Sequence, residues 1–137
     1  MKKIVILNFT GLRGNWGCQA TSFELLKFLS GIYPDNTPLH FDFVPLLATT
    51  KLDAELDDQL DSIYQSFEDV SESEVGSNKA LEYLTSIVER RYAAWLTTLR
   101  EADLVVFQAE GSMGMGEDFA KGPRLMVLPF VAKHAWN

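Results

Sequence analysis

Cysteine, histidine and long apolar runs are all scarce in this sequence. The single cysteine, Cys18, excludes an internal disulfide and a zinc site built from cysteines, so a reducing compartment is favoured and we expect a cytoplasmic protein. The two histidines, His40 and His134, stand far apart and show no metal-ligand spacing. No apolar stretch approaches the roughly 20 residues that cross a membrane. We therefore expect no metal, no cofactor and no membrane span.

Basic residues are in the minority, 12 against 19 acidic residues, which gives a net charge of −7. Nucleic-acid binding requires clustered lysine and arginine, and no such cluster is visible, so we exclude a nucleic-acid partner. The acidity is local, because nine of the acidic residues lie between Asp53 and Asn78, where there is no lysine or arginine. Without these nine charges the rest of the chain sums to +2.

The length of the chain sets the number of domains. With 137 residues, 47% of them hydrophobic, it is long enough for one domain with a core and short for two. We expect residues 1–137 to form a single domain. Residues 68–77, rich in serine and glutamate, have the composition of a flexible linker between helices.

Three short apolar segments, 3–9, 39–44 and 103–109, predict β-strands. The first is continuously apolar, as in a central parallel strand buried on both faces, and the third predicts a second buried strand. The middle segment alternates apolar and polar residues between Pro38 and Pro45, which is typical of a strand nearer the edge of the sheet.

Apolar residues spaced by three and four predict helices at 18–33, 52–67, 78–99 and 123–137. The segment 78–99 is predicted to be one helix of about five turns, with Asn78 as its N-cap. Strands that alternate with helices imply right-handed crossovers and a parallel sheet covered on both faces. The predicted fold class is therefore α/β, with a Rossmann-like doubly wound sheet.

The loop after the first strand, residues 10–19, is rich in glycine. Its glycines, among them Gly14 and Gly17, allow a ligand to approach the backbone, and the following helix start offers N–H groups to a phosphate or carboxylate. The loop could instead be a tight turn that requires positive φ and binds nothing. Trp16 either stacks on a sugar ring or closes the loop onto the core.

The glycine spacing in this loop, Gly-x-x-Gly-x-x-Gly, differs from the G-x-G-x-x-G of dinucleotide folds and lacks the lysine of a P-loop. Asp42 does stand near the end of the second strand, where an NAD site places its ribose carboxylate. A dinucleotide dehydrogenase is therefore an alternative that the spacing disfavours.

A second glycine loop, residues 108–116, follows the third strand. Glu110 in this loop could bind sugar hydroxyls or act as an acid or base if burial raises its pKa, or it could simply cap the following turn. Cys18 starts a helix, where a thiolate is favoured, but no histidine is near it in sequence to complete a nucleophilic pair.

Three segments together, 14–21, 102–112 and 128–134, resemble the polysaccharide pyruvyl transferase family in order and spacing. The resemblance covers essentially the whole chain but only the N-terminal half of a family member. Two places differ from many members. Cys18 stands where they carry aspartate, and Glu110-Gly111-Ser112 stands where they have three glycines.

The resemblance implies a glycosyltransferase-B-like enzyme that transfers the pyruvyl group of phosphoenolpyruvate to a sugar hydroxyl in cell-surface or exopolysaccharide synthesis. This chain would be its N-terminal, acceptor-side domain, inactive alone, and a C-terminal domain would bind phosphoenolpyruvate. In this interpretation Glu110 orients or deprotonates the attacking hydroxyl. The residues expected to bind the acceptor glycan are Gly14, Asn15, Trp16, Gly17, Gln19, Gly111 and Ser112.

A different class of function stays open beside this one. The chain could be a non-catalytic module that binds a sugar or nucleotide and needs a partner domain. An exposed parallel sheet edge favours association. We therefore expect either a homodimer or a partner domain.

Overall fold

The computed structural model describes residues 1–45, 78–108 and 122–136, together with isolated residues between positions 63 and 75. The helix predicted at 52–67 lies almost entirely outside the described residues. Of the linker predicted at 68–77, the described residue Val75 is buried in the hydrophobic core. In the described part of the chain, no helix has the length and apolar character needed to cross a membrane.

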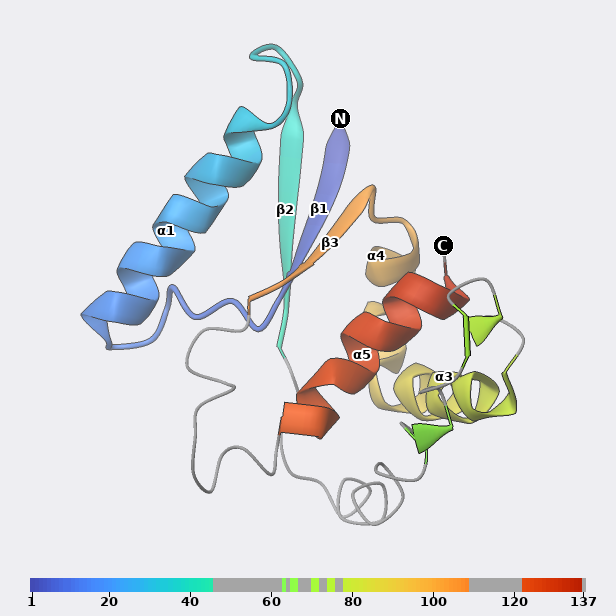
Figure 1. Cartoon of the computed structure of the whole chain (residues 1–137). Coiled ribbons are helices and arrows are strands. Elements are labelled where there is room, and N and C mark those ends of the chain that lie inside the picture. The colour runs from blue at the N-terminus through green and yellow to red at the C-terminus, as the bar shows by residue number, and fades with distance from the viewer. Residues whose placement is uncertain are drawn as a thin grey trace.

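Three parallel strands form an open sheet in the order β2-β1-β3 (Figure 1). The central strand is β1 (Lys2–Leu7), with β2 (Leu39–Val44) on one side and β3 (Leu104–Phe107) on the other. The prediction of a central first strand and a second strand at the edge is confirmed. In β1 the residues from Ile4 to Leu7 are fully buried.

The third strand differs from its prediction as a second buried strand. All four residues of β3 are only half-buried. The reason is its place in the sheet, because β3 pairs with β1 on one side and no strand among the described residues pairs with its other side. An apolar run cannot distinguish a central strand from an edge strand that helices cover.

Helices cover both faces of the sheet, as predicted for an α/β protein (Figure 1). One face carries α1 (Trp16–Gly31), and the other carries α3 (Lys79–Arg91), α4 (Leu96–Arg100) and α5 (Gly122–Ala135). This open parallel sheet between two helical layers is compatible with a Rossmann-like fold.

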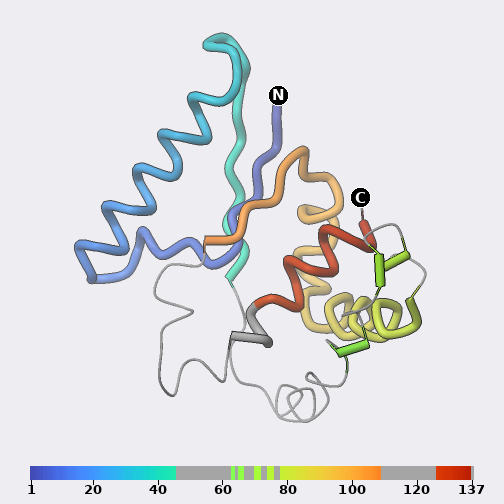
Figure 2. Tube along the Cα trace, viewed as in Figure 1, coloured from blue at the N-terminus to red at the C-terminus, as the bar shows by residue number. Residues whose placement is uncertain are grey.

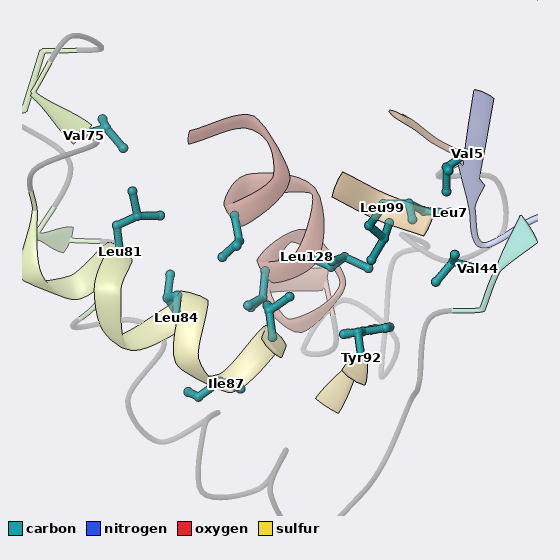
Figure 3. Close-up of a cluster of buried hydrophobic side chains, with 13 residues drawn as sticks. Val5, Leu7, Val44, Val75, Leu81, Leu84, Ile87, Tyr92, Leu99 and Leu128 are labelled. Carbon is teal, nitrogen blue, oxygen red and sulfur yellow. The ribbon is translucent and has the colours of Figure 1, made fainter. Parts of the chain in front are cut away.

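The side chains of β1 alternate between two hydrophobic clusters, one on each face. Ile4 and Ile6 pack with Leu29 of α1. Val5 and Leu7 enter the larger cluster, which buries side chains of α3, α4 and α5 (Figure 3). The central strand therefore holds both helical layers together.

The single helix predicted for 78–99 is interrupted. After α3 the chain makes a 3-10 turn, η2 (Ala93–Trp95), before α4 begins. The interruption lies at Tyr92, whose φ of −106° and ψ of 24° are not helical. Its ring is buried beside the core, and Leu99 of α4 enters the same core. Tertiary packing requires this change of direction, which helical periodicity alone does not contain.

Candidate functional site

The carboxyl ends of β1 and β3 mark the point at which the strand order reverses. From β1 the chain passes through α1 to β2 on one side, and it later returns to β3 on the other. In open α/β sheets, ligands bind outside the carboxyl ends of two such strands. The segments that follow β1 and β3 come together at this edge (Figure 2). We take this edge as the candidate site.

Gln108, the first residue after β3, joins these two segments. Its Nε2 donates to Thr10 Oγ1 at 3.0 Å and to Ser22 Oγ at 2.7 Å, and its Oε1 accepts from the backbone N–H of Thr10 at 3.3 Å. The hydroxyls of Thr10 and Ser22 lie 3.1 Å apart. All three side chains are buried, so these bonds satisfy polar groups that water does not reach.

Asn8 makes a second connection across the same edge. It directly follows β1 and adopts a φ of 60°, a left-handed conformation that asparagine tolerates better than most residues. Its Nδ2 donates to the backbone oxygen of Gln108 at 2.9 Å, and its backbone N–H donates to the backbone oxygen of Val44 at 2.9 Å. Its Oδ1 accepts from Arg13 Nη2 at 3.2 Å. Asn8 therefore contacts the ends of both neighbouring strands and the loop.

We call the four buried residues Asn8, Thr10, Ser22 and Gln108 the switch-point cluster. They were not singled out as site residues from the sequence. A signal was present, because Asn8 and Gln108 are polar residues that directly follow apolar strands, and Thr10 stands two residues after Asn8. Ser22 is a polar residue on the side of α1 that faces the sheet.

The glycines of the loop after β1 differ in what they do. A Cβ on Gly11 would lie 2.5 Å from Phe9 Cζ and 3.0 Å from Ser22 Cβ, so this position requires glycine for close packing. A Cβ on Gly14 would have no heavy atom of the described residues within 4 Å. Neither glycine has positive φ, so the proposal of a turn that needs it is wrong here, and the positive φ lies at Asn8 instead.

The start of α1 is capped by its own sequence. Asn15 Oδ1 accepts from the N–H groups of Gly17 at 2.8 Å and Cys18 at 3.2 Å, and the backbone oxygen of Asn15 accepts from Gln19 N–H. These N–H groups, expected to be free for an anion, are therefore occupied. The Gln19 side chain donates to the backbone oxygen of Arg13 at 2.8 Å and so fixes the loop.

Trp16 lies at the first position of α1 and is 86% exposed. The alternative in which its ring closes the loop onto the core is therefore wrong. Leu12 in the same loop is exposed as well. The loop presents an indole ring to solvent near Gly14, at which an added Cβ would meet no heavy atom of the described residues within 4 Å.

The other residues considered from the sequence lie elsewhere. Asp42 Oδ1 is 3.3 Å from His40 Nε2 on the same strand, so the carboxylate that an NAD site would use has a neighbour within β2. The ring of His134 packs against Phe130 within α5. In the portion of the chain that the structure describes, no three histidine, cysteine or acidic side chains gather as a metal site would require.

Glu110, Gly111 and Ser112 lie outside the described residues, so their predicted roles stay predictions. Among the predicted residues that are described, Gly14, Asn15, Trp16, Gly17 and Gln19 all belong to the loop and helix start beside the switch-point cluster. The described part of the site thus joins a buried neutral cluster to an exposed loop.

A separate hollow of about 410 Å³ lies between β3, α4 and α5. Its lining includes Phe107, Arg100 and Trp136, and it extends to Asp103, directly before β3. No residue of the loop after β1 lines it. It is therefore distinct from the candidate site at the switch point.

Comparisons of the chain with models of protein families, with curated proteins and with solved structures find no match.

Proposed function

We propose that this chain is the acceptor-side domain of a pyruvyl transferase with a glycosyltransferase-B-like architecture. The observation that carries the proposal is the set of hydrogen bonds from Gln108 to Thr10 and Ser22. They join Gln108, in the segment 102–112 that resembles the pyruvyl transferase family, to Thr10 and Ser22, which lie just outside the resembling segment 14–21. They do so at the edge where open α/β sheets bind ligands.

Three neighbouring residues of the loop suit an acceptor glycan. The exposed ring of Trp16 offers an apolar face on which a sugar ring can stack. Gly14 leaves the backbone beside it open to close approach. Arg13 adds a guanidinium, which suits a carboxylate or phosphate group on the acceptor.

The chemistry assigned to the complete enzyme is ketal formation. Two acceptor hydroxyl oxygens form bonds to C2 of phosphoenolpyruvate, and the bond from C2 to the phosphate oxygen breaks. One hydroxyl proton goes to the terminal carbon, which becomes a methyl group, and the other leaves with phosphate. Glu110 would accept the first hydroxyl proton.

In this proposal phosphoenolpyruvate is bound by a second domain. This chain contributes the acceptor side. The buried amides and hydroxyls of the switch-point cluster bond to one another and so hold the loop, whose exposed side chains would contact the acceptor.

One observation favours the second candidate, a non-catalytic sugar- or nucleotide-binding module. The switch-point cluster consists of two amides and two hydroxyls, and none of these four groups ionises near neutral pH. The cluster can therefore hold the loop that would contact a ligand, but it cannot itself exchange a proton at neutral pH.

Turnover assays distinguish the two candidates. The chain is incubated with phosphoenolpyruvate and a pool of oligosaccharide acceptors, alone and within the complete two-domain protein, and phosphate release is measured. The transferase proposal predicts product only with both domains, and it predicts that Glu110→Gln abolishes turnover while acceptor binding persists. If Glu110→Gln leaves both binding and turnover intact, the assigned role is wrong. Product formed by the chain alone excludes the module.

Acceptor binding by the chain alone tests the site directly. Calorimetric titration with the same oligosaccharides should show that Trp16→Ala weakens binding about tenfold, because it removes the stacking surface. Tyr83→Ala removes an exposed aromatic side chain from α3, on the other face of the sheet, and should leave binding unchanged. Equal effects of the two variants would contradict a site at the switch point.

A further inference from the structure

The outward face of α1 is unusually apolar for a helix on the surface. Phe23 and Phe28 are 59% and 66% exposed, and Ile32 is exposed as well. The helix carries only two charged residues in 16, Glu24 and Lys27, whereas α3 carries five in 13. A surface helix ordinarily turns its polar residues outward. Exposed apolar side chains gathered on one element mark an interaction surface.

The sheet does not account for this apolar character. The opposite side of α1 already packs on the sheet through Leu29, with Leu25 and Leu26 partly buried beside it. The helix therefore has apolar residues on both sides and a covering layer on only one. The outward side is therefore open to a second surface from outside the described residues of this chain.

The outward residues form an ordered pattern. At about 100° per residue, Ala20, Glu24, Lys27 and Gly31 form a single row along the helix, with Phe23 on one flank of the row and Phe28 on the other. The two ends of the row are small residues. Beside Gly31 the surface is hollowed, and this hollow of about 390 Å³ is lined by Glu24, Lys27, Phe28, Gly31 and Ile32.

We propose that this face binds a second copy of the same chain, with the two α1 helices antiparallel. A two-fold axis level with the midpoint between residues 25 and 26 places Glu24 level with the partner's Lys27, and Lys27 level with the partner's Glu24. The same axis places Ala20 level with the partner's Gly31 at each end of the contact. The row is therefore complementary to itself, as a two-fold interface requires.

Charge and size both favour this register. Glu24 Oε1 and Lys27 Nζ already lie 3.6 Å apart within one helix. The pairing therefore brings together four charges, two from each helix, in which each charge has neighbours of the opposite sign. A parallel pairing would instead place each charge beside its own copy. At both ends, the small side chains and the hollow at Gly31 allow the helix backbones to approach closely. The two Phe23 rings then cover one flank of the helix pair, and the two Phe28 rings cover the other.

Sedimentation velocity of the 137-residue chain over a range of concentrations tests this interface. We expect a dimer that dissociates on dilution. Glu24→Lys alone, and Lys27→Glu alone, place like charges opposite each other and should weaken dimerisation about tenfold or more. The double variant Glu24→Lys/Lys27→Glu restores unlike pairs and should restore the dimer. Both side chains are about three-quarters exposed, so the variants should fold, as circular dichroism can verify.

The control is Glu82→Lys, the same change of charge at an exposed position of α3, which should leave the dimer intact. A chain that stays monomeric at all concentrations overturns the proposal. A dimer that resists both single reversals, or one that the double variant fails to restore, also overturns it. The test does not depend on the proposed function, because no residue of the switch-point cluster is altered.

Discussion

The side-chain nitrogen Nε2 of Gln108 donates a hydrogen bond to the hydroxyl of Ser22 at a distance of 2.7 Å. This bond links the end of β3 to the middle of α1, two elements that are 86 positions apart in sequence. Both partners are buried, so neither can exchange the other for water without cost. The candidate site therefore depends on long-range polar contacts for its shape.

Ser22→Ala should lower the free energy of unfolding by about 1 to 3 kcal/mol, because it leaves a buried N–H of Gln108 without one of its acceptors. Ser30→Ala is the matched control on the same helix, since its hydroxyl is exposed and donates to the backbone oxygen of Leu26 in the same helix. The control should change stability by less than about 0.5 kcal/mol. Urea unfolding curves measure both, and equal losses would show that the bond to Gln108 contributes nothing.

Replacements of Asn8 separate backbone strain from hydrogen bonding. Asn8→Gly and Asn8→Ala both remove the bond to the backbone oxygen of Gln108, so both should be less stable than the wild type. Only alanine is strained at a φ of 60°, and it should be less stable than the glycine variant by about 1 kcal/mol. Thermal unfolding compares the two. An alanine variant as stable as the glycine variant would contradict a left-handed Asn8.

Alanine substitutions at two loop glycines should change stability by different amounts. Gly11→Ala places a Cβ against the ring of Phe9, and it should cost about 1 to 3 kcal/mol because the ring must move. Gly14→Ala meets no heavy atom of the described residues and should change stability by less than about 0.5 kcal/mol. Denaturant unfolding of both variants checks this. If Gly14→Ala is destabilised, the loop conformation in which a Cβ on Gly14 touches no described residue is contradicted.

Acid should destabilise the folded state partly by protonating the carboxylate of Asp103. Its carboxylate accepts from Lys2 Nζ at 2.6 Å and from the backbone N–H of Lys3 at 2.8 Å, and these bonds hold the pKa of Asp103 below its ordinary value of 3.8. A depressed pKa stabilises the folded state above the unfolded value, and that contribution is lost as the pH falls through 3.8 toward the folded value.

Asp103→Asn should therefore lower stability at neutral pH and flatten the dependence of stability on pH below about 4. The measurement is a series of unfolding curves from neutral pH down to pH 3. Asp35→Asn, a charge removal in the exposed turn between α1 and β2, is the control. If Asp103→Asn and the control show the same acid dependence, the ion pair with Lys2 does not contribute.

Much of the fold can be predicted from local patterns. The continuous apolar run at 3–9 identifies β1 as a central strand, and prolines on both sides of 39–44 delimit β2, because each pattern reports burial or backbone constraint at its own position. The cap of α3 is equally local, since Asn78 Oδ1 accepts from the N–H of Ala80. The break at Tyr92 is not predictable in this way, because nothing in the periodicity of 78–99 marks it.

The candidate site was predicted only in part. The loop after β1 was identified from its glycines and Trp16, but Asn15 serves as the cap of α1, and the buried cluster beside the loop was missed. Gln108 stands far from the other three members in sequence and meets them through the parallel pairing of β1 with β3, while Ser22 is brought in by the packing of α1 on the sheet. A polar residue after an apolar run does not reveal which distant group it will bond.

The sequence by itself determined the α/β alternation, the central position of β1 and the cap of α3 at Asn78, because each depends on residues that are neighbours along the chain. Only the tertiary structure decided that Trp16 is exposed, that β3 is a half-buried edge strand, and that Gln108 meets Ser22. Those features depend on which distant surfaces pack together, and in a polar cluster the partners must match in direction as well as in burial.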